Sequence, residues 1–513
     1  MRRIWLCVVA ALVVVAFPAS PSVREREARP ADAITASRLR ERVAFLTSAA
    51  LEGRYPGSAG FRFAAAYAAS QLSAAGVVPL VESGGGDAFL QAVPLRRRTA
   101  TDAVVVTVTT PSGARTFAPG ALKLFASEGL IEGGKPLEVV FAGFGIHEPS
   151  AGWDDLAGLD VVGKAVLVMV GAPVKNGKPV LPEALHASHA PGNALLRRHG
   201  LFHGAAAVLA VPDAELAKEL PEFPDVPEGP QFVLADEAPG SGVNAALALV
   251  SPELASALMD GTDLPDATDA DSIRARRGEV PGVTVTIRAT VLDEKTETWN
   301  VVGLVGGTDP TLRQQVVAVS AHLDHLPPTA EGEVHPGAND DASGAAALLE
   351  IARILAAHPP RRSVLFALFG AEEGGSMGAR HFLARGPLAR DRIVADVNMD
   401  MIGRTEKGLE ADRAHYALGS GTVTAAFTRL VETVNARSVR WPLRYAHPLN
   451  LGSSDHDAFA ALAIPAVNFY SGRVAETHQT TDTADRLDYD KAEVIARLVC
   501  EIAFELGNRD PLW

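Results

Sequence analysis

The sequence contains very little cysteine. Cys7 and Cys500 are its two cysteines in 513 residues, and Cys7 lies inside an apolar stretch at the N-terminus. If that stretch is removed as an export signal, Cys500 alone remains and no internal disulfide can form. The stability of the folded chain must then come from burial of a core and from any metal that it binds.

A dense block of basic residues is also absent beyond the first hundred residues. Acidic residues outnumber basic ones by 61 to 47, which gives a formal net charge of −14 with histidine neutral. Nucleic-acid-binding proteins carry clustered Lys and Arg that neutralise phosphates. The charge balance therefore argues against a nucleic acid as partner.

The chain also lacks an apolar run long enough to span a bilayer. Arg2 and Arg3 precede an uncharged stretch from Ile4 to Phe17, which is 14 residues long, whereas a membrane span needs about 20. A basic start followed by a short apolar segment is typical of a secretory signal. We expect a signal peptide over residues 1–22, a linker over 23–34, no stable membrane span in the mature chain, and a secreted or periplasmic location.

With 513 residues and 47% hydrophobic residues, the chain is globular and too long for one ordinary core. The pattern of apolar, glycine and proline residues changes near residues 130 and 285. We expect the N-terminal part of one domain over residues 35–129, an inserted β-rich α/β domain over 130–285, and the catalytic part of the first domain over 286–513.

Strand and helix patterns alternate over the last 220 or so residues. Strands are predicted for Val316 to Ala321, Val364 to Phe369, Val394 to Met399 and Ile464 to Phe469, and a helix is predicted for Ala342 to Leu355. This alternation favours an α/β fold with a mostly parallel mixed sheet covered by helices on both faces.

Candidate metal ligands follow these strands or open the helix. They are His322, Asp340, Glu372 with Glu373, Asp400 and His478. Taken singly, each has an ordinary structural explanation, such as a helix N-cap for Asp340. Five such signals in order beside strand ends are not expected from capping alone, and the loops at the carboxyl ends of parallel strands meet in one cleft.

Two histidines and three carboxylates suit Zn²⁺, although cobalt or manganese accepts the same donors. If one carboxylate bridges, two ions can be held, each with one His and one further carboxylate. Two such ions can activate a water between them and polarise a carbonyl. The pattern therefore predicts a two-metal hydrolase.

These residues resemble a known family, the M28 zinc aminopeptidases. The motifs that carry the resemblance are His322-Leu-Asp324-His325, Gly337-Ala-Asn-Asp340-Asp341-Ala-Ser-Gly344, Gly370-Ala-Glu372-Glu373-Gly374, Asn398-Met-Asp400-Met and Thr477-His478-Gln-Thr-Thr-Asp482-Thr483, with a looser match at Leu51-Glu-Gly-Arg54. The insertion resembles a protease-associated domain through Val140-Phe-Ala-Gly-Phe-Gly145 and Leu159-Asp-Val-Val-Gly163-Lys164.

The resemblance implies a zinc-exopeptidase fold of the phosphorylase/hydrolase-like kind and a role for each motif residue. His322 and Asp400 would bind one zinc ion, Glu373 and His478 the other, and Asp340 both. Glu372 would be the general base that deprotonates the bridging water. The carboxylate of Asp324 would accept the second ring N–H of His322.

The resemblance also implies a cis peptide bond between Asp340 and Asp341. Four more residues of the cleft-forming segments are candidates for supporting ligands or contacting substrate: Asp341, His325, Asp455 and Tyr470.

The implied activity is release of N-terminal residues from peptides that have a free terminus, with two Zn²⁺ per chain. Three alternatives stay open: a carboxypeptidase or dipeptidase on the same scaffold, a glutaminyl cyclase with a single zinc, and a receptor-like binding protein without catalysis. The complete set of five ligands argues against the last two.

Overall fold

The structure is a computed structural model. It describes residues 29–81, 88–100, 104–126, 134–189, 202, 204–214, 216–219, 231–236, 246–260, 265, 269–288, 290–329, 331–407, 414–418, 424–445 and 454–513. The predicted signal peptide over 1–22 and residues 23–28 of the predicted linker therefore lie outside the described residues.

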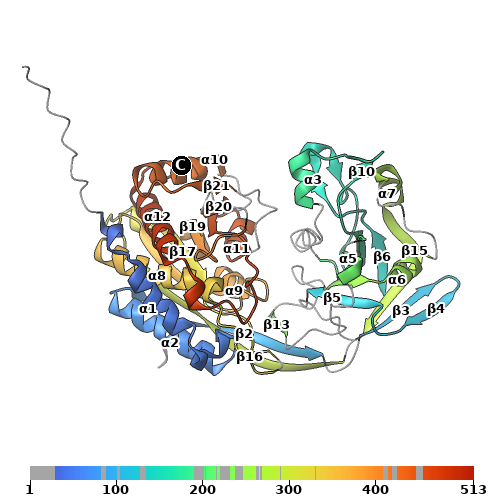
Figure 1. The fold of residues 1–513 in the computed structure, drawn as a ribbon, viewed down its shortest axis with the longest axis horizontal. Coiled ribbons are helices and arrows are strands. Elements are labelled where there is room, and N and C mark those ends of the chain that lie inside the picture. The colour runs from blue at the N-terminus through green and yellow to red at the C-terminus, as the bar shows by residue number, and fades with distance from the viewer. Residues whose placement is uncertain are drawn as a thin grey trace, which may run out of the picture.

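Ten strands form the first sheet, which lies to the left in Figure 1. In spatial order they are β13 (Gln231–Leu234), β2 (Leu90–Ala100), β16 (Val291–Val305), β18 (Ser363–Phe369), β17 (Val316–His322), β19 (Ile393–Met399), β22 (Ala466–Tyr470), β20 (Ala414–Leu418) and β21 (Leu443–Tyr445), while β1 (Val78–Pro79) pairs with β16. The four central strands β18, β17, β19 and β22 are parallel, and antiparallel pairs flank them on both sides. The predicted mixed sheet with a parallel centre is confirmed.

The central strands consist mainly of apolar residues because both of their faces are covered. Every residue of β17 and of β18 is buried. Alternate residues of β17 belong to two different hydrophobic clusters, one on each side of the sheet. Val317 and Val319 belong to the larger cluster, and Val316 and Ala318 belong to the smaller one.

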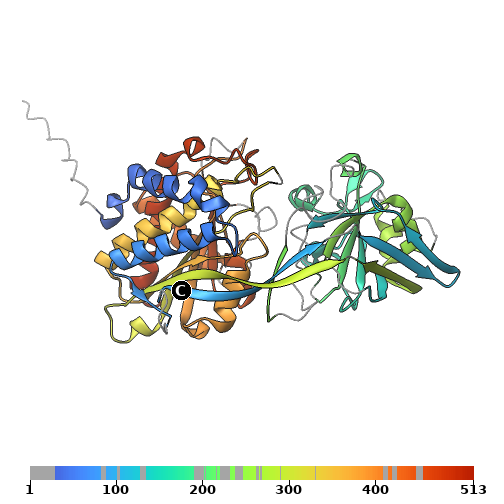
Figure 2. The same cartoon turned by 90° about the horizontal axis from the view of Figure 1, so that it is seen from below.

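Helices cover both faces (Figures 1 and 2). The larger cluster, with Val317, contains residues of α1 (Ala36–Leu46), α2 (Ala59–Ala74), α8 (Ser343–Ala357), α10 (Thr424–Arg437) and α12 (Tyr489–Asn508). The smaller cluster, with Val316, contains residues of α9 (Met377–Arg385) and α11 (His456–Ala461). The predicted helix at Ala342 to Leu355 is α8.

Side-chain caps explain where several of these helices begin. Thr35 accepts a hydrogen bond from the backbone N–H of Arg38 at the start of α1, and Ser58 accepts one from Phe61 at the start of α2. Asp488 does the same for Lys491 in α12. Each cap satisfies one N–H group that the first helical turn leaves without a partner.

Eight strands form the second sheet. In spatial order they are β4 (Gly113–Phe117), β3 (Val105–Thr110), β15 (Gly278–Arg288), β6 (Leu137–Phe141), β9 (Ala165–Met169), β12 (Ala207–Val211), β14 (Ala246–Val250) and β5 (Leu122–Ala126). Two short pairs, β7 (His147–Glu148) with β8 (Trp153–Asp154) and β10 (Val174–Lys175) with β11 (Lys178–Pro179), lie outside it. The helices between these strands are α3 (Glu183–His189), α5 (Leu216–Glu219), α6 (Pro252–Leu258) and α7 (Ala270–Arg276).

Strand pairing differs from the expected division of the chain in two places. Strands β3, β4 and β5, which the sequence analysis assigned to the first domain, pair within the second sheet, while β13 pairs with β2 of the first. The reason is that a half-buried strand has the same pattern whichever sheet receives it. We propose that the insertion begins near residue 104 rather than 130. Its likeness to a protease-associated domain stays a prediction.

The two sheets are joined by a long antiparallel ribbon of β2 and β16, which Figure 2 shows crossing between them. Residues 291–301 of β16 pair with residues 90–100 of β2. Among the described residues, no helix combines the length and the apolar character needed to cross a membrane.

Candidate metal centre

The predicted ligands converge at the carboxyl ends of the central strands. His322 is the last residue of β17, Asp400 follows β19 directly, and Glu373 lies in the loop after β18. His478 lies in the loop after β22, and Asp340 lies in the turn that leads into α8. Because parallel strands end at the same edge of a sheet, side chains far apart in the sequence meet there.

Distances between the side chains place Asp340 in the middle of the group. Its Oδ1 lies 3.2 Å from Nε2 of His322, and its Oδ2 lies 3.1 Å from Nε2 of His478. Nε2 of His322 also lies 3.6 Å from Oδ1 of Asp400, and Nε2 of His478 lies 3.2 Å from Oε2 of Glu373. All five predicted ligands are therefore brought together, with Asp340 between two His–carboxylate pairs.

Two of these atoms are buried without a hydrogen-bond partner, Nε2 of His322 and Oδ1 of Asp400. Buried polar atoms are almost always satisfied, and leaving one unpaired is unfavourable. An imidazole nitrogen and a carboxylate oxygen facing each other fit a cation that accepts both donor types. The residues of this site therefore fit a metal ion.

The buried carboxylates of the site also need neighbouring positive charge. Burial lowers the pKa of His322, but the neighbouring carboxylates of Asp340 and Asp400 outweigh burial and raise that pKa well above its usual value. Burial raises the pKa of Asp340, but the two imidazoles of His322 and His478 beside it hold it well below the usual range. The charge of Glu373 raises the pKa of His478. Divalent cations would supply the positive charge that protonated imidazoles otherwise provide.

The site is more open on one side than on the other. The His478 side chain keeps 38% of its surface exposed, whereas that of His322 keeps 1%. The group is therefore most accessible to solvent at His478.

Asp324 lies behind the ligands but makes a different contact from the one expected. Nδ1 of His322 is bonded to the backbone carbonyl of Asp324 at 3.1 Å, and the Asp324 carboxylate lies 3.9 Å away. That carboxylate accepts the backbone N–H groups of Glu372 at 3.0 Å and Glu373 at 3.4 Å. Burial raises its pKa to about 6. Asp324 therefore forms hydrogen bonds with three of the predicted site residues, His322, Glu372 and Glu373.

Glu372 precedes the predicted ligand Glu373 and has no predicted ligand role of its own. Burial raises its pKa well above the usual value, the charge of His322 opposes the shift, and the charges of Asp455 and Asp400 add to it. A carboxyl group with a raised pKa beside a metal site is suited to taking up a proton.

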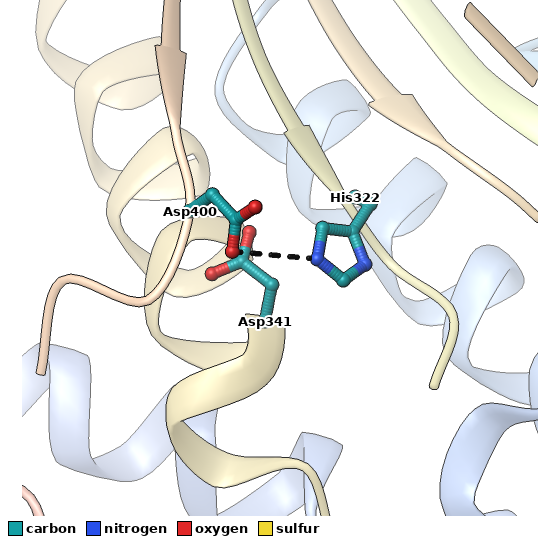
Figure 3. Close-up of side chains that lie close together, drawn as sticks. All are labelled: His322, Asp341 and Asp400. Carbon is teal, nitrogen blue, oxygen red and sulfur yellow. Dashed lines mark ion pairs between the residues drawn. The ribbon is translucent and has the colours of Figure 1, made fainter. Parts of the chain in front are cut away.

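Asp341 faces the same ring as Asp400. His322, Asp341 and Asp400 form one buried group with the spacing of a metal site, and Figure 3 shows both carboxylates beside the imidazole. Oδ1 of Asp341 accepts the N–H groups of Gly344 at 2.9 Å and Met401 at 3.1 Å, while Oδ2 has no partner. The peptide bond between Asp340 and Asp341 is cis, as the resemblance implied.

His325 contacts the second half of the site. It is fully buried, and its Nδ1 lies 2.6 Å from Oε1 of Glu373. Its Nε2 has no partner, and His325, Asp340 and Glu373 form a second group with the spacing of a metal site. His325 is therefore placed either to orient the Glu373 carboxylate through a hydrogen bond or to serve as a metal ligand in place of Glu373.

The remaining candidates, Asp455 and Tyr470, are buried near the site. Asp455 stands at the start of α11, neither of its carboxylate oxygens has a hydrogen-bond partner, and burial raises its pKa well above the usual value. Tyr470 ends β22, and burial raises its pKa as well.

Two supporting residues were given no role from the sequence. Asp482 accepts the backbone N–H groups of Asn339 and Asp340 at 3.0 and 3.2 Å, and so fixes the turn that carries Asp340. Arg54 is fully buried beneath the same turn. Both residues lie in quoted motifs, but contacts to backbone atoms leave no recognisable spacing in a sequence.

Comparisons with known proteins relate the part of the chain that carries this site to a peptidase family. Residues 300–503 match the profile of peptidase family M28. An aminopeptidase of Pseudomonas aeruginosa (strain UCBPP-PA14) is 37% identical over 158 residues, which is 30% of this chain and 28% of that protein. A probable zinc metalloprotease of Pyrenophora tritici-repentis is 41% identical over 71 residues, covering 14% of this chain and 16% of that protein. These matches span well under half the length of either relative.

The fold has a counterpart among solved structures. The aminopeptidase from Aneurinibacillus sp. strain AM-1 aligns over 94% of this chain and 96% of its own, with a TM-score of 0.52 and 20% sequence identity. At that identity the likeness shows the fold rather than a shared substrate.

Proposed function

Residues 300–503 belong to peptidase family M28, and from that premise we propose that this chain is a metal-dependent aminopeptidase. In this proposal the enzyme uses two zinc ions to remove residues from the N-termini of peptides. The observation that carries the proposal is the carboxylate of Asp340, whose two oxygens each face a different histidine at 3.2 and 3.1 Å. The names of the matched relatives support both the aminopeptidase activity and the zinc.

His322 and Asp400 would hold one ion, His478 and Glu373 the other, and Asp340 both. When bound, the ions would polarise the scissile carbonyl and lower the pKa of a water molecule between them. Because Nδ1 of His322 is bonded to the Asp324 carbonyl, its Nε2 is left free of a proton for a metal.

Glu372 would act as the general base. It accepts a proton from the attacking water and returns that proton to the nitrogen of the leaving amine, so that the charge of the carboxylate is restored at the end of the cycle. The bond from the Glu372 backbone N–H to Asp324 supports this role, because it fixes the segment that carries the base. Burial among other acids keeps its proton affinity high.

The aminopeptidase reading requires that a free amine be recognised. It is tested with three matched peptides: one with both termini free, one with the N-terminus acetylated and one with the C-terminus amidated. We expect the free and the C-amidated peptides to be hydrolysed and the acetylated peptide to resist. Hydrolysis of the free and the acetylated peptides, with resistance of the C-amidated peptide, would favour a carboxypeptidase instead.

The expected signal peptide leads us to propose that the enzyme is exported. A probable lipoprotein aminopeptidase of Mycobacterium tuberculosis, 28% identical over 239 residues, which is 41% of this chain and 46% of that protein, is compatible with work outside the cytoplasm. N-terminal sequencing of the protein recovered from the culture medium and from cell fractions tests this proposal.

A further inference from the structure

Arg54 is a cation buried next to the candidate metal centre but outside its ligand set. None of its surface is exposed. Its guanidinium donates to four backbone carbonyls: Nε to Leu323 at 2.8 Å, Nη1 to Leu46 at 2.6 Å and Pro336 at 2.8 Å, and Nη2 to Gly337 at 2.9 Å. The planar fork of an arginine can bond several fixed acceptors at once, which a lysine cannot reproduce.

Three of the four acceptors lie on the two segments that carry His322, Asp324 and Asp340. Leu323 stands between His322 and Asp324, so its carbonyl fixes the chain just past the end of β17. Pro336 and Gly337 begin the turn that delivers Asp340. One side chain therefore ties the segment of one histidine to the segment of the shared carboxylate.

The segment that carries Arg54 is folded tightly against the same turn. Glu52, Gly53 and Arg54 all have positive φ, at 50°, 76° and 59°. A Cβ atom at Gly53 would lie 2.6 Å from the carbonyl oxygen of Leu326 and 2.9 Å from that of His335. Glycine is therefore needed at position 53, both for its backbone conformation and for the close approach.

Acidic residues surround the guanidinium without replacing its carbonyl bonds. Burial lowers the pKa of Arg54, and the charges of Asp324, Asp482, Asp341 and Asp340 oppose that shift. Arginine stays charged in such an environment. Its charge in turn offsets the mutual repulsion of these aspartates, whose side chains lie together at one end of the sheet.

We infer that Arg54 is a positioning residue for the metal centre, which holds the His322 and Asp340 segments at the separation that two ions require. The inference rests on the proposed function, because it presumes that these residues bind zinc. Arg54 does not touch the ions or the substrate in this account. Its effect on catalysis passes through the ligands.

Arg362 provides a matched control at the opposite end of the same sheet. It is 2% exposed and donates to the backbone carbonyls of Leu506 and Arg509 and to the side chain of Gln315, just before β18 begins. It is thus a second buried arginine that binds mainly carbonyls, but it lies far along the strands from the ligands. Substitution of Arg362 therefore measures how much stability is lost when a buried, carbonyl-bonding arginine is removed far from the proposed metal ligands.

The experiment compares Arg54→Met, Arg54→Lys and Arg362→Met in the full chain. Zinc affinity is measured by competition with a chromophoric chelator, and the unfolding temperature is measured for metal-free protein. We expect Arg54→Met to weaken zinc binding by about 10- to 100-fold, as losses of groups that support metal ligands do, and Arg54→Lys to weaken it less. Arg362→Met should lower the unfolding temperature while changing zinc affinity less than about threefold, because it touches no group that supports a ligand.

Each outcome decides the question. Equal zinc affinity in Arg54→Met, Arg362→Met and wild type would overturn the inference. If Arg54→Met does not fold, Arg54→Lys decides, and wild-type affinity in that variant, or failure of both to fold while Arg362→Met folds, would overturn it too. A wild-type chain that binds no zinc would refute the proposed function instead, so the two failures are distinguishable.

Discussion

Each of the two sheets is built around four parallel strands, β18, β17, β19 and β22 in the first and β6, β9, β12 and β14 in the second. In both sheets these strands are mainly apolar and contribute to the hydrophobic clusters. Their carboxyl ends differ. In the first sheet they are followed by histidine and acidic residues, whereas β9 is followed by Val170, Gly171 and Ala172.

The acidic residues of the second sheet are also satisfied in a different way. Asp155 is buried, and its Oδ2 accepts N–H groups from Phe144, Ile146 and the Trp153 ring at 2.9 to 3.2 Å. Asp213, after β12, caps α5 through the N–H of Leu216. In the first sheet, by contrast, His322 and Asp400 keep buried atoms without partners.

The comparison shows that a parallel strand edge provides a place for a site but not the site itself. What distinguishes the first sheet is a group of imidazole and carboxylate atoms at its strand ends that fits an additional cation. Within the described part of the chain, both groups with the spacing of a metal site lie at this edge. The following changes test that distinction, beginning with the largest expected effect.

Asp340→Asn should abolish the two-metal arrangement. Asparagine offers one acceptor oxygen, so one of the two histidines loses the carboxylate that faces it. We expect at least one zinc ion per chain to be lost and turnover to fall by more than about a thousandfold, because the metals supply most of the electrostatic stabilisation. Atomic absorption and hydrolysis of a free-amine peptide measure the two effects.

Asp155→Asn is the control for that variant in the second sheet. It removes a buried carboxylate that holds three N–H groups, so stability should fall by about 1–3 kcal/mol, while zinc content and turnover stay at the wild-type values. A loss of zinc in Asp155→Asn equal to that in Asp340→Asn would remove the contrast between the two sheets.

Glu372→Gln should separate metal binding from proton transfer. The amide keeps the size of the side chain but cannot accept the proton of the attacking water, so we expect turnover to fall by about 10²- to 10⁴-fold. Zinc content should not change. Turnover near that of the wild type would show that another group is the base.

Asp324→Asn should have an intermediate effect. Its carboxylate accepts the backbone N–H groups of Glu372 and Glu373, and an amide would present a donor to one of them. We expect zinc affinity to fall by about 10- to 100-fold, while metal-free protein unfolds at nearly the wild-type temperature. Competition with a chelator checks the affinity, and unchanged binding would leave Asp324 without a role in the site.

Asp396→Asn should have the smallest effect on activity but a visible effect on the pH dependence of stability. Asp396 is fully buried in β19, Ser320 donates to one of its oxygens, and burial raises its pKa to about 8. A raised folded-state pKa means that the folded chain keeps a proton that the unfolded chain releases above about pH 4. Stability contributed by this group is therefore complete below that pH and declines by up to about 1.4 kcal/mol per pH unit until pH 8.

The asparagine variant removes that titration, so its stability curve between pH 4 and 8 should be flatter than that of the wild type. Denaturant unfolding at several pH values, with metal removed from both proteins, provides the measurement. Parallel curves for the two proteins would show that Asp396 does not carry a buried proton.

The strand and helix pattern of the catalytic part was predictable because buried parallel strands are continuous apolar runs. The strands at β17, β18 and β19 lie within one residue of their predicted bounds. The convergence of His322, Asp340, Glu373, Asp400 and His478 followed from strand ends alone. Membership of β3 in the second sheet did not, since its alternation fits either sheet.

Contacts to the backbone were the main features that the sequence did not reveal. The bond from His322 goes to the carbonyl of Asp324 rather than to its carboxylate, and Arg54 binds carbonyls from four residues. Every residue has a carbonyl, so such contacts leave no signal in residue type. They depend on how the loops fold, which the three-dimensional structure alone provides.

The most direct test of the account is diffraction from crystals of the zinc-loaded protein at wavelengths on either side of the zinc absorption edge. We expect two anomalous peaks, one on each side of the Asp340 carboxylate, the first next to His322 and Asp400 and the second next to His478 and Glu373. A single peak, or peaks away from these five side chains, would contradict the two-metal centre.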